Sequence, residues 1–153
     1  MNRIVEEDLS GIAAGLGELA GRFENAKILI TGHTGFLGTQ FTAFFGFANE
    51  RLLKKPAEVT CVDNRIVDLE DLTGPFTRGF RVIQGDAVQA IEKFDFDYIF
   101  HCAGIASPPY YRKFPLETIR ANAISLWEML NRIEKGRVRG ILYFSSSEIY
   151  SCP

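Results

Sequence analysis

The sequence predicts an α/β fold, in which helices cover both faces of a doubly wound parallel sheet. Three observations support this class. Short apolar runs alternate with helix-like segments, a cluster of glycines marks the first strand-to-helix junction, and a proline and a glycine bound the longest helix-like segment. Because strand–helix–strand units cross over in the right-handed sense, such an alternation builds a parallel sheet.

Five apolar runs bounded by turn-forming residues are the expected strands. They are K-I-L-I-T (27–31), E-V-T-C-V (58–62), F-R-V-I-Q (80–84), D-Y-I-F-H-C-A (97–103) and G-I-L-Y-F-S (140–145). Residues 65–72 give an ambiguous pattern. We expect the strand order 3-2-1-4-5, as in a Rossmann-type sheet.

Helix-like segments separate these strands. They are 36–53, 87–93 and 115–135. Proline is tolerated in a first helical turn, so Pro115 can open the last of them, and Gly136 is typical of a residue that ends a helix. Between the fourth strand and this helix, Pro108, Pro109 and Pro115 predict a loop.

Residues 1–24 precede the first strand and are expected to form a helical extension. One helical face carries apolar residues, namely Ile12, Leu16, Leu19 and Phe23. Four glycines weaken this helix, each by up to about 1 kcal/mol relative to alanine. The apolar face predicts packing on the domain or on a partner chain.

The composition excludes several classes of function. The 153 residues are 46% hydrophobic and 24% charged, which suits a globular domain with a sizeable core. A net charge of −2 provides no basic surface for nucleic acid or an anionic membrane. No apolar run is long enough to span a bilayer, and the acidic start of the chain lacks a signal-peptide apolar region. We expect neither nucleic acid nor a membrane as a partner.

The three cysteines, Cys61, Cys102 and Cys152, lack the spacing of metal ligands, so we expect no metal site. Cys61 and Cys102 fall in expected strands, where a free thiol packs as a small hydrophobe. This usage favours the reducing cytoplasm. His101 is expected to be a hydrogen-bonded core residue, and His33 is expected to face solvent.

The stretch T-G-H-T-G-F-L-G (31–38) carries the chemistry of the first strand-to-helix junction. At such a junction Gly32 allows a tight bend, Gly35 lets the backbone approach a diphosphate, and Gly38 lets the helix pack closely. Unpaired N–H groups and the positive end of the helix dipole then bind the diphosphate. The spacing G-x-x-G-x-x-G predicts a dinucleotide site, and the alternative is an ordinary glycine-rich turn.

Asp63 stands at the end of the second expected strand, where a carboxylate can accept hydrogen bonds from the adenosine ribose hydroxyls. The same charge would repel a 2′-phosphate, so NAD is favoured over NADP. Arg65 keeps NADP open, because a nearby arginine can accommodate that phosphate. The alternative for Asp63 is a plain turn residue.

Five ordered motifs together resemble the extended short-chain dehydrogenase/reductase family of nucleotide-sugar epimerases, dehydratases and decarboxylases. They are T-G-H-T-G-F-L-G (31–38), V-D-N (62–64), G-D-A (85–87), D-Y-I-F-H-C-A-G (97–104) and F-S-S-S-E-I-Y (144–150). The resemblance implies that residues 25–153 are an NAD-binding domain. It implies cofactor contacts from Gly32, Gly35, Phe36, Leu37, Gly38, Asp63, Asn64, Asp86, Ala87, Cys102, Ala103, Gly104, Asn122 and Ser145, with Asp86 facing the adenine.

Within that family, A-S-P-P-Y-Y-R-K-F-P-L-E-T (106–118) is similar to the UDP-glucuronate decarboxylases. The 4,6-dehydratases carry an aspartate where this chain has Ser147. The resemblance implies that Ser146 bonds the sugar 4-oxygen and that Ser147 and Glu148 line the reacting end of the sugar. Substrate contacts are implied for Ser107, Pro108 and Tyr111, although Tyr111 could equally pack within its loop.

The reaction implied is transient oxidation at C4 of a UDP-sugar, with a 4-epimerase or a 4,6-dehydratase as the close alternatives. The base of this family is a tyrosine in a Y-x-x-x-K motif, and none of the five tyrosines here has that partner. We therefore expect the first half of such an enzyme, inactive as residues 1–153 alone. A non-catalytic dinucleotide-binding module is the alternative of another class. The resemblance implies a homodimer for a full-length enzyme, and a dimer of this segment is doubtful.

Overall fold

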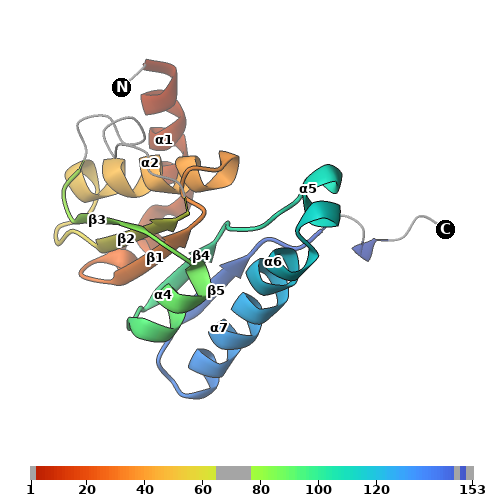
Figure 1. Cartoon of the computed structure of the whole chain (residues 1–153). Helices are drawn as coiled ribbons and strands as arrows, with labels where there is room; N and C mark the ends of the chain where they lie inside the picture. The colour runs from red at the N-terminus through yellow and green to blue at the C-terminus, as the bar shows by residue number, and fades with distance from the viewer. Residues whose placement is uncertain (1–2, 65–76, 147–148, 151–153) are drawn as a thin grey trace.

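The computed structural model describes residues 3–64, 77–146 and 149–150, and its centre is a parallel sheet of five strands (Figure 1). The strands are β1 (Lys27–Thr31), β2 (Glu58–Asp63), β3 (Phe80–Gln84), β4 (Tyr98–His101) and β5 (Gly140–Tyr143). Their order is β3-β2-β1-β4-β5, which confirms the expected doubly wound topology. β4 and β5 end two residues earlier than the sequence suggested.

Helices cover both faces of this sheet. They are α1 (Arg3–Leu16), the 3₁₀ segment η1 (Gly17–Phe23), α2 (Phe36–Arg51), α4 (Ala87–Lys93), α5 (Pro108–Lys113), α6 (Pro115–Ile119), the π segment η2 (Arg120–Ile124) and α7 (Ser125–Glu134). Figure 1 shows α1 and α2 on one side of the sheet and α4, α6 and α7 on the other.

The two faces of β1 explain the two hydrophobic cores. Ile28 and Ile30 point to the core beneath α1 and α2, which also holds Phe44 and Phe45. Leu29, between them in the sequence, points to the core beneath α4 and α7. Because successive strand residues face opposite sides, a strand covered on both faces is apolar across its buried centre, as Ile28, Leu29 and Ile30 are.

The N-terminal extension packs on the sheet through a face that differs partly from the expected one. Phe23 lies edge-on to Phe45, with ring centroids 5.2 Å apart, and Leu9 is 2% exposed. Ile12 and Leu19 are exposed, so their assignment to the packed face is wrong. Within α1 the packed face runs through Leu9, Ala13 and Leu16, which leaves Ile12 beside it, and after Leu16 the tighter η1 ends the 3.6-residue period before Leu19.

The expected loop between β4 and the long helix contains the short helix α5, so that expectation is wrong. Pro108 and Pro109 occupy its first turn, where a missing N–H costs nothing. Three prolines close together therefore limit where helices begin without excluding them.

The long helix expected from Pro115 is interrupted by a π turn at η2. The N–H of Ser125 bonds the carbonyl of Arg120, five residues back. Gly136 has a φ of +67°, which confirms it as the helix stop. π turns are frequently found at functional sites, and this one borders the pocket described next.

Candidate functional site

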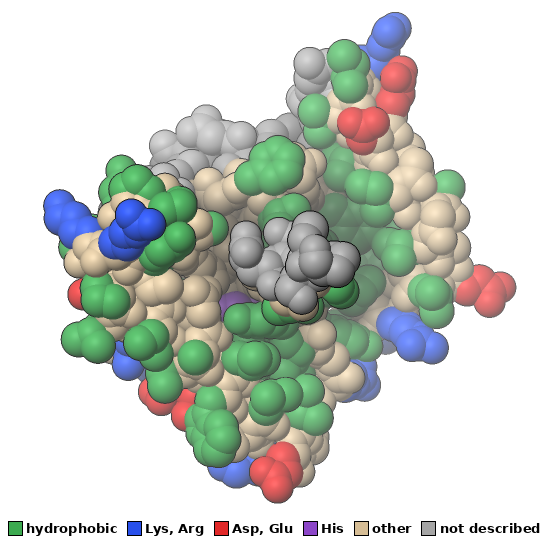
Figure 2. Space-filling view, turned by 90° about the vertical axis from the view of Figure 1, so that its right-hand side faces the viewer, with side chains coloured by type: hydrophobic (Ala, Val, Ile, Leu, Met, Phe, Trp, Pro, Cys, Tyr) green, Lys and Arg blue, Asp and Glu red, His purple; other side chains and the backbone are tan. Residues whose placement is uncertain are grey.

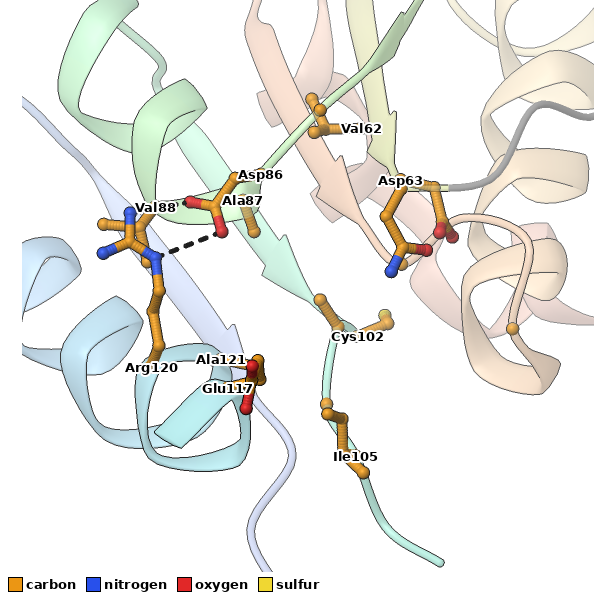
Figure 3. Close-up of a pocket in the computed structure, with 16 residues that line it drawn as sticks. Val62, Asp63, Asp86, Ala87, Val88, Cys102, Ile105, Glu117, Arg120 and Ala121 are labelled. Atoms are coloured by element: carbon orange, nitrogen blue, oxygen red, sulfur yellow. Dashed lines mark hydrogen bonds and ion pairs between the residues drawn. The ribbon is translucent and has the colours of Figure 1, made fainter. Parts of the chain in front are cut away.

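A pocket of about 330 Å³ lies at the carboxyl ends of β1, β2, β3 and β4 (Figure 3). In an open α/β sheet this edge is where ligands bind. Its lining residues are Gly32, Gly35, Val62, Asp63, Asn64, Gly85, Asp86, Ala87, Val88, Cys102, Ala103, Gly104, Ile105, Glu117, Arg120 and Ala121.

The glycine-rich turn forms one wall of the pocket. Gly32 has a φ of +67°, which side chains other than glycine rarely adopt, and a Cβ there would lie 2.6 Å from the Ala103 nitrogen. Gly38 lies where the helix crosses this turn, and a Cβ on it would lie 2.1 Å from the Gly32 carbonyl oxygen. The backbone itself therefore requires glycine at both positions.

The amino end of α2 opens toward the pocket at Gly35, its N-cap residue. Within the described part of the chain, no side chain caps this helix end. The first-turn N–H groups of Phe36, Leu37 and Gly38 have no partner inside the helix and carry the positive end of its dipole. Such an end suits a diphosphate, which the backbone can approach closely because Gly35 has no side chain.

Asp63 ends β2 and lies beside the glycine-rich turn. Its Oδ2 accepts hydrogen bonds from the hydroxyl of Thr34 at 2.7 Å and from the Thr34 N–H at 3.2 Å. These contacts tie the turn to the end of the neighbouring strand. The carboxylate borders the pocket, as binding to a ribose requires.

Asp86 is the N-cap of α4, and its Oδ1 accepts the N–H of Gln89. Arg120 reaches across from the start of η2 and donates from Nε to Oδ2 at 3.2 Å and from Nη2 to Oδ1 at 3.1 Å. Burial alone would raise the pKa of Asp86, but the hydrogen bonds from Arg120 and Gln89 outweigh it and hold that pKa below its ordinary value. Figure 3 shows this pair at one end of the pocket.

His33 is buried, which overturns the expectation that it faces solvent. The turn folds back on α2 so tightly that the His33 side chain has 0% exposure. Neither ring nitrogen has a hydrogen-bond partner among the described residues. Burial lowers the pKa of His33, with the Val62 backbone and the charge of Asp63 acting in the opposite direction.

His101 links three elements, as expected of a satisfied core residue. Its Nδ1 lies 2.7 Å from the hydroxyl of Thr31, and its Nε2 lies 2.9 Å from both the Ala121 carbonyl and the Ser125 hydroxyl. A carbonyl can only accept, so Nε2 carries the proton and Nδ1 accepts from Thr31. The ring also stacks on Tyr143, with centroids 5.8 Å apart.

The two histidines make the stability of the fold dependent on pH. Burial lowers the pKa of His33 and of His101 below the ordinary 6.5, which the unfolded chain retains. The unfolded state therefore binds more protons below about pH 6.5, and the free energy of unfolding should fall as the pH drops from 7 to 5. Each histidine can contribute a slope of up to about 1.4 kcal/mol per pH unit.

Urea unfolding at pH 7, 6 and 5 measures this slope. The His33→Leu variant removes one of the two groups and should show a shallower decline, with His101 as the remaining contributor. Stability that is constant or rises as the pH falls from 7 to 5 would contradict the assignment of both histidines as buried and neutral.

The structure brings nine of the sequence-predicted cofactor residues to the pocket: Gly32, Gly35, Asp63, Asn64, Asp86, Ala87, Cys102, Ala103 and Gly104. Gly38 does not line the pocket, but it packs against the backbone of Gly32, which does. Asn122 lies against Gly104, because its Oδ1 is 2.8 Å from where a Gly104 Cβ would stand.

Other predicted residues lie outside this pocket. The side chain of Phe36 is 84% exposed, so only its backbone can serve the site, and Leu37 is also exposed. Ser145, Ser146, Ser107, Pro108 and Tyr111 are exposed beyond β5 or on α5. Ser147 and Glu148 lie outside the described residues.

Sequence reasoning missed seven of the lining residues: Val62, Gly85, Val88, Ile105, Glu117, Arg120 and Ala121. Three of them come from the long helix. Glu117, Arg120 and Ala121 have the spacing i, i+3, i+4, so they share one helical face. A shared helical face soon after the fourth strand is the sequence feature from which these three residues could have been predicted.

Cys102 lies one residue beyond β4, half-buried at the pocket, whereas the sequence placed it within the strand. Burial raises the pKa of its thiol to about 11, so it is neutral and supplies an unreactive surface. Among the described residues no group of His, Cys, Asp and Glu is arranged to hold a metal ion. No described helix has the length and apolar character needed to cross a membrane.

Comparison with known proteins places these observations in a family. The model of the NAD dependent epimerase/dehydratase family matches residues 28–152. UDP-glucuronic acid decarboxylase 1 of Danio rerio is 34% identical over 134 residues, which cover 85% of this chain and 29% of that protein. UDP-glucuronic acid decarboxylase 1 of Arabidopsis thaliana is 31% identical, covering 83% of this chain and 28% of that protein. The chain thus spans less than a third of these curated relatives.

Solved structures of nucleotide-sugar epimerases share the fold. UDP-N-acetylglucosamine 4-epimerase of Methanobrevibacter ruminantium, in complex with UDP-N-acetylmuramic acid, is 25% identical with a TM-score of 0.61, covering 83% of this chain and 40% of that one. UDP-glucose 4-epimerase of Bifidobacterium longum, in complex with NAD⁺ and UDP, is 23% identical with a TM-score of 0.59, covering 81% and 38%. With its family-model match over most of its length, this chain belongs to the NAD-dependent epimerase/dehydratase family.

Proposed function

We propose that this chain is the NAD-binding part of a nucleotide-sugar enzyme of the UDP-glucuronate decarboxylase type. One observation carries the proposal: the glycine-rich turn, Asp63 and Asp86 converge on a single pocket at the carboxyl edge of the sheet. We further propose that residues 25–153 are the dinucleotide domain and residues 1–24 an extension packed on it.

Each part of the pocket has a role in holding the cofactor. The N–H groups at the start of α2 bind the diphosphate beside Gly32 and Gly35. The Asp63 carboxylate accepts from ribose hydroxyls, and its charge disfavours a 2′-phosphate. At the other end, Ala103 and Gly104 border the cofactor where β4 ends, with Asn122 packed behind them.

When bound, NAD supplies the hydride acceptor for oxidation of the sugar at C4. The chain contributes orientation: Ser146, just after β5, would hydrogen-bond the sugar 4-oxygen. Ser147 and Glu148 are proposed to line the reacting end of the sugar, with Ser107, Pro108 and Tyr111 contributing further substrate contacts. Proton transfer requires a base of the Y-x-x-x-K type, which residues 1–153 do not include.

Calorimetry with NAD and NADP tests the cofactor site. The chain should bind NAD more tightly than NADP, and Asp63→Asn should reduce this preference by about tenfold, since it removes one unit of repulsion from the 2′-phosphate. Asp97→Asn is the matched control. Asp97 is a carboxylate at the opposite edge of the sheet, where its Oδ2 accepts the Lys27 N–H. A chain that binds neither dinucleotide would overturn the proposed site.

Activity separates the reaction from its alternatives. We expect residues 1–153 to bind NAD without releasing CO₂ from UDP-glucuronate, and a longer protein that includes the Y-x-x-x-K tyrosine to release it. Interconversion of the C4 epimers without CO₂ would identify a 4-epimerase, and elimination at C5–C6 a 4,6-dehydratase. The relatives at 31–34% identity favour the decarboxylase. A longer protein that binds NAD and transforms no UDP-sugar would identify a non-catalytic module.

We also propose that the full-length enzyme is a homodimer that uses the helix from Pro115. Figure 2 shows many hydrophobic side chains on the face that looks to the right in Figure 1. Among those exposed on α6 and α7 are Leu116, Trp127 and Leu130. A full-length enzyme that sediments as a single chain would contradict this proposal.

A further inference from the structure

We propose that Arg120 is a positioning residue that holds the Asp86 carboxylate ready to accept a hydrogen bond from the amino group of the adenine base, and so sets the preference of this site for adenine. The inference rests on the proposed binding of NAD. It concerns a pair of side chains that join α4 to the π segment η2 across one end of the pocket.

The strand order places the base at this end. The proposed diphosphate site lies at the end of β1. Asp63, whose carboxylate is proposed to bind the ribose, lies at the end of the adjacent β2. The next strand outward is β3, and the turn after it supplies Gly85, Asp86 and Ala87 to the pocket. A nucleotide that runs outward along the sheet edge from its diphosphate therefore brings its base to Asp86.

The Asp86 carboxylate is fixed and keeps acceptor capacity. Among the described residues, three hydrogen bonds come from the Gln89 N–H, Arg120 Nη2 and Arg120 Nε, and the Val88 N–H also helps to lower the pKa of Asp86. Two of these three meet Oδ1, and the one from Arg120 Nε meets Oδ2. A carboxylate offers about four acceptor sites, so Oδ2 can take one more donor. An ionised carboxylate accepts only, so it favours an amino group over the oxo group of hypoxanthine.

Arginine suits this position better than lysine would. Its planar guanidinium donates to both carboxylate oxygens and sets the plane of the group, whereas an ammonium is a single point charge. Arg120 is also the one Lys or Arg among the described residues that line the pocket, against Asp63, Asp86 and Glu117. It offsets part of the negative charge that a diphosphate would meet.

The π segment that begins at Arg120 is held in place by hydrogen bonds. The Ser125 N–H bonds the Arg120 carbonyl, and the next carbonyl, that of Ala121, accepts from His101 Nε2 at 2.9 Å and from the Ser125 hydroxyl. A buried network thus holds the segment whose first residue reaches Asp86. The Arg120 and Asp86 side chains are 46% and 38% exposed, so their pairing contributes little to the stability of the fold.

Calorimetry with NAD and with its hypoxanthine analogue tests the inference. Wild-type protein should prefer NAD by about tenfold, the usual effect of one hydrogen bond to a charged group. Arg120→Gln should reduce this preference to about twofold, and Arg120→Lys should retain an intermediate preference. In an Asp86→Asn background, which keeps a residue suited to the N-cap, Arg120→Gln should cause no further change.

Arg139→Gln is the matched control, because Arg139 pairs with Asp97 at 3.4 Å away from the pocket. It should keep the full preference. If Arg120→Gln weakens both ligands equally, or weakens neither, the inference is overturned while the proposed NAD site stands. If wild-type protein binds neither ligand, the proposed function fails and the inference fails with it.

Discussion

Gly38→Ala should lower the free energy of unfolding by about 3 kcal/mol, in the range of overpacked positions, although alanine is ordinarily the better helix residue. The added Cβ would stand 2.1 Å from the Gly32 carbonyl oxygen and 2.6 Å from the His33 Cα. Both neighbours are backbone atoms, so a side-chain rotation cannot relieve the contact. The turn must move away from α2, and NAD affinity should fall with the stability because the same turn forms the diphosphate site.

Gly11→Ala is the matched control. Gly11 also lies within a helix, α1, and a Cβ there would meet nothing within 4 Å. This substitution should raise stability by up to about 1 kcal/mol through helix propensity alone. Urea unfolding of both variants measures the difference. Equal effects of the same sign in the two variants would contradict the close approach at Gly38.

Most of the fold could be predicted because its signals are local. Ile28, Leu29 and Ile30 form an apolar run too short for a helix, and both of its faces are buried in the structure. The glycine-rich turn was predictable for the same reason, because its backbone conformation demands residues that are visible in the sequence. The positive φ of Gly32 and the close approach at Gly38 explain why the motif has glycine at these two positions.

The rest depended on contacts between distant segments. The burial of His33 results from the way the turn folds on α2, and no neighbour in the sequence reports it. The pairing of Arg120 with Asp86 joins residues 34 apart. Both ends were visible as charged residues, but only the packing of the long helix beside α4 brings them together. The α5 helix was not predicted because proline ordinarily breaks a helix, whereas Pro108 and Pro109 occupy a first turn, where proline is tolerated.

His101→Phe should lower the free energy of unfolding by about 3 kcal/mol and weaken NAD binding. Phenylalanine can keep the stacking on Tyr143, but it removes both ring nitrogens. The Thr31 hydroxyl then loses the acceptor that lies 2.7 Å away, in a fully buried position. The Ala121 carbonyl loses one of its donors. An unsatisfied buried hydroxyl alone costs about 1–3 kcal/mol, and the larger ring adds strain.

The loss of NAD affinity should follow because His101 holds the π segment that carries Arg120 and Asn122. Tyr143→Phe is the matched control: it keeps the stack and removes only a 3.3 Å hydrogen bond to the Asn122 carbonyl. It should cost less than about 1 kcal/mol, since that hydrogen bond is long. Urea unfolding and NAD calorimetry on both variants distinguish the two contributions. If His101→Phe lowers stability and NAD affinity as little as Tyr143→Phe does, the hydrogen bonds of His101 do not hold the π turn in place.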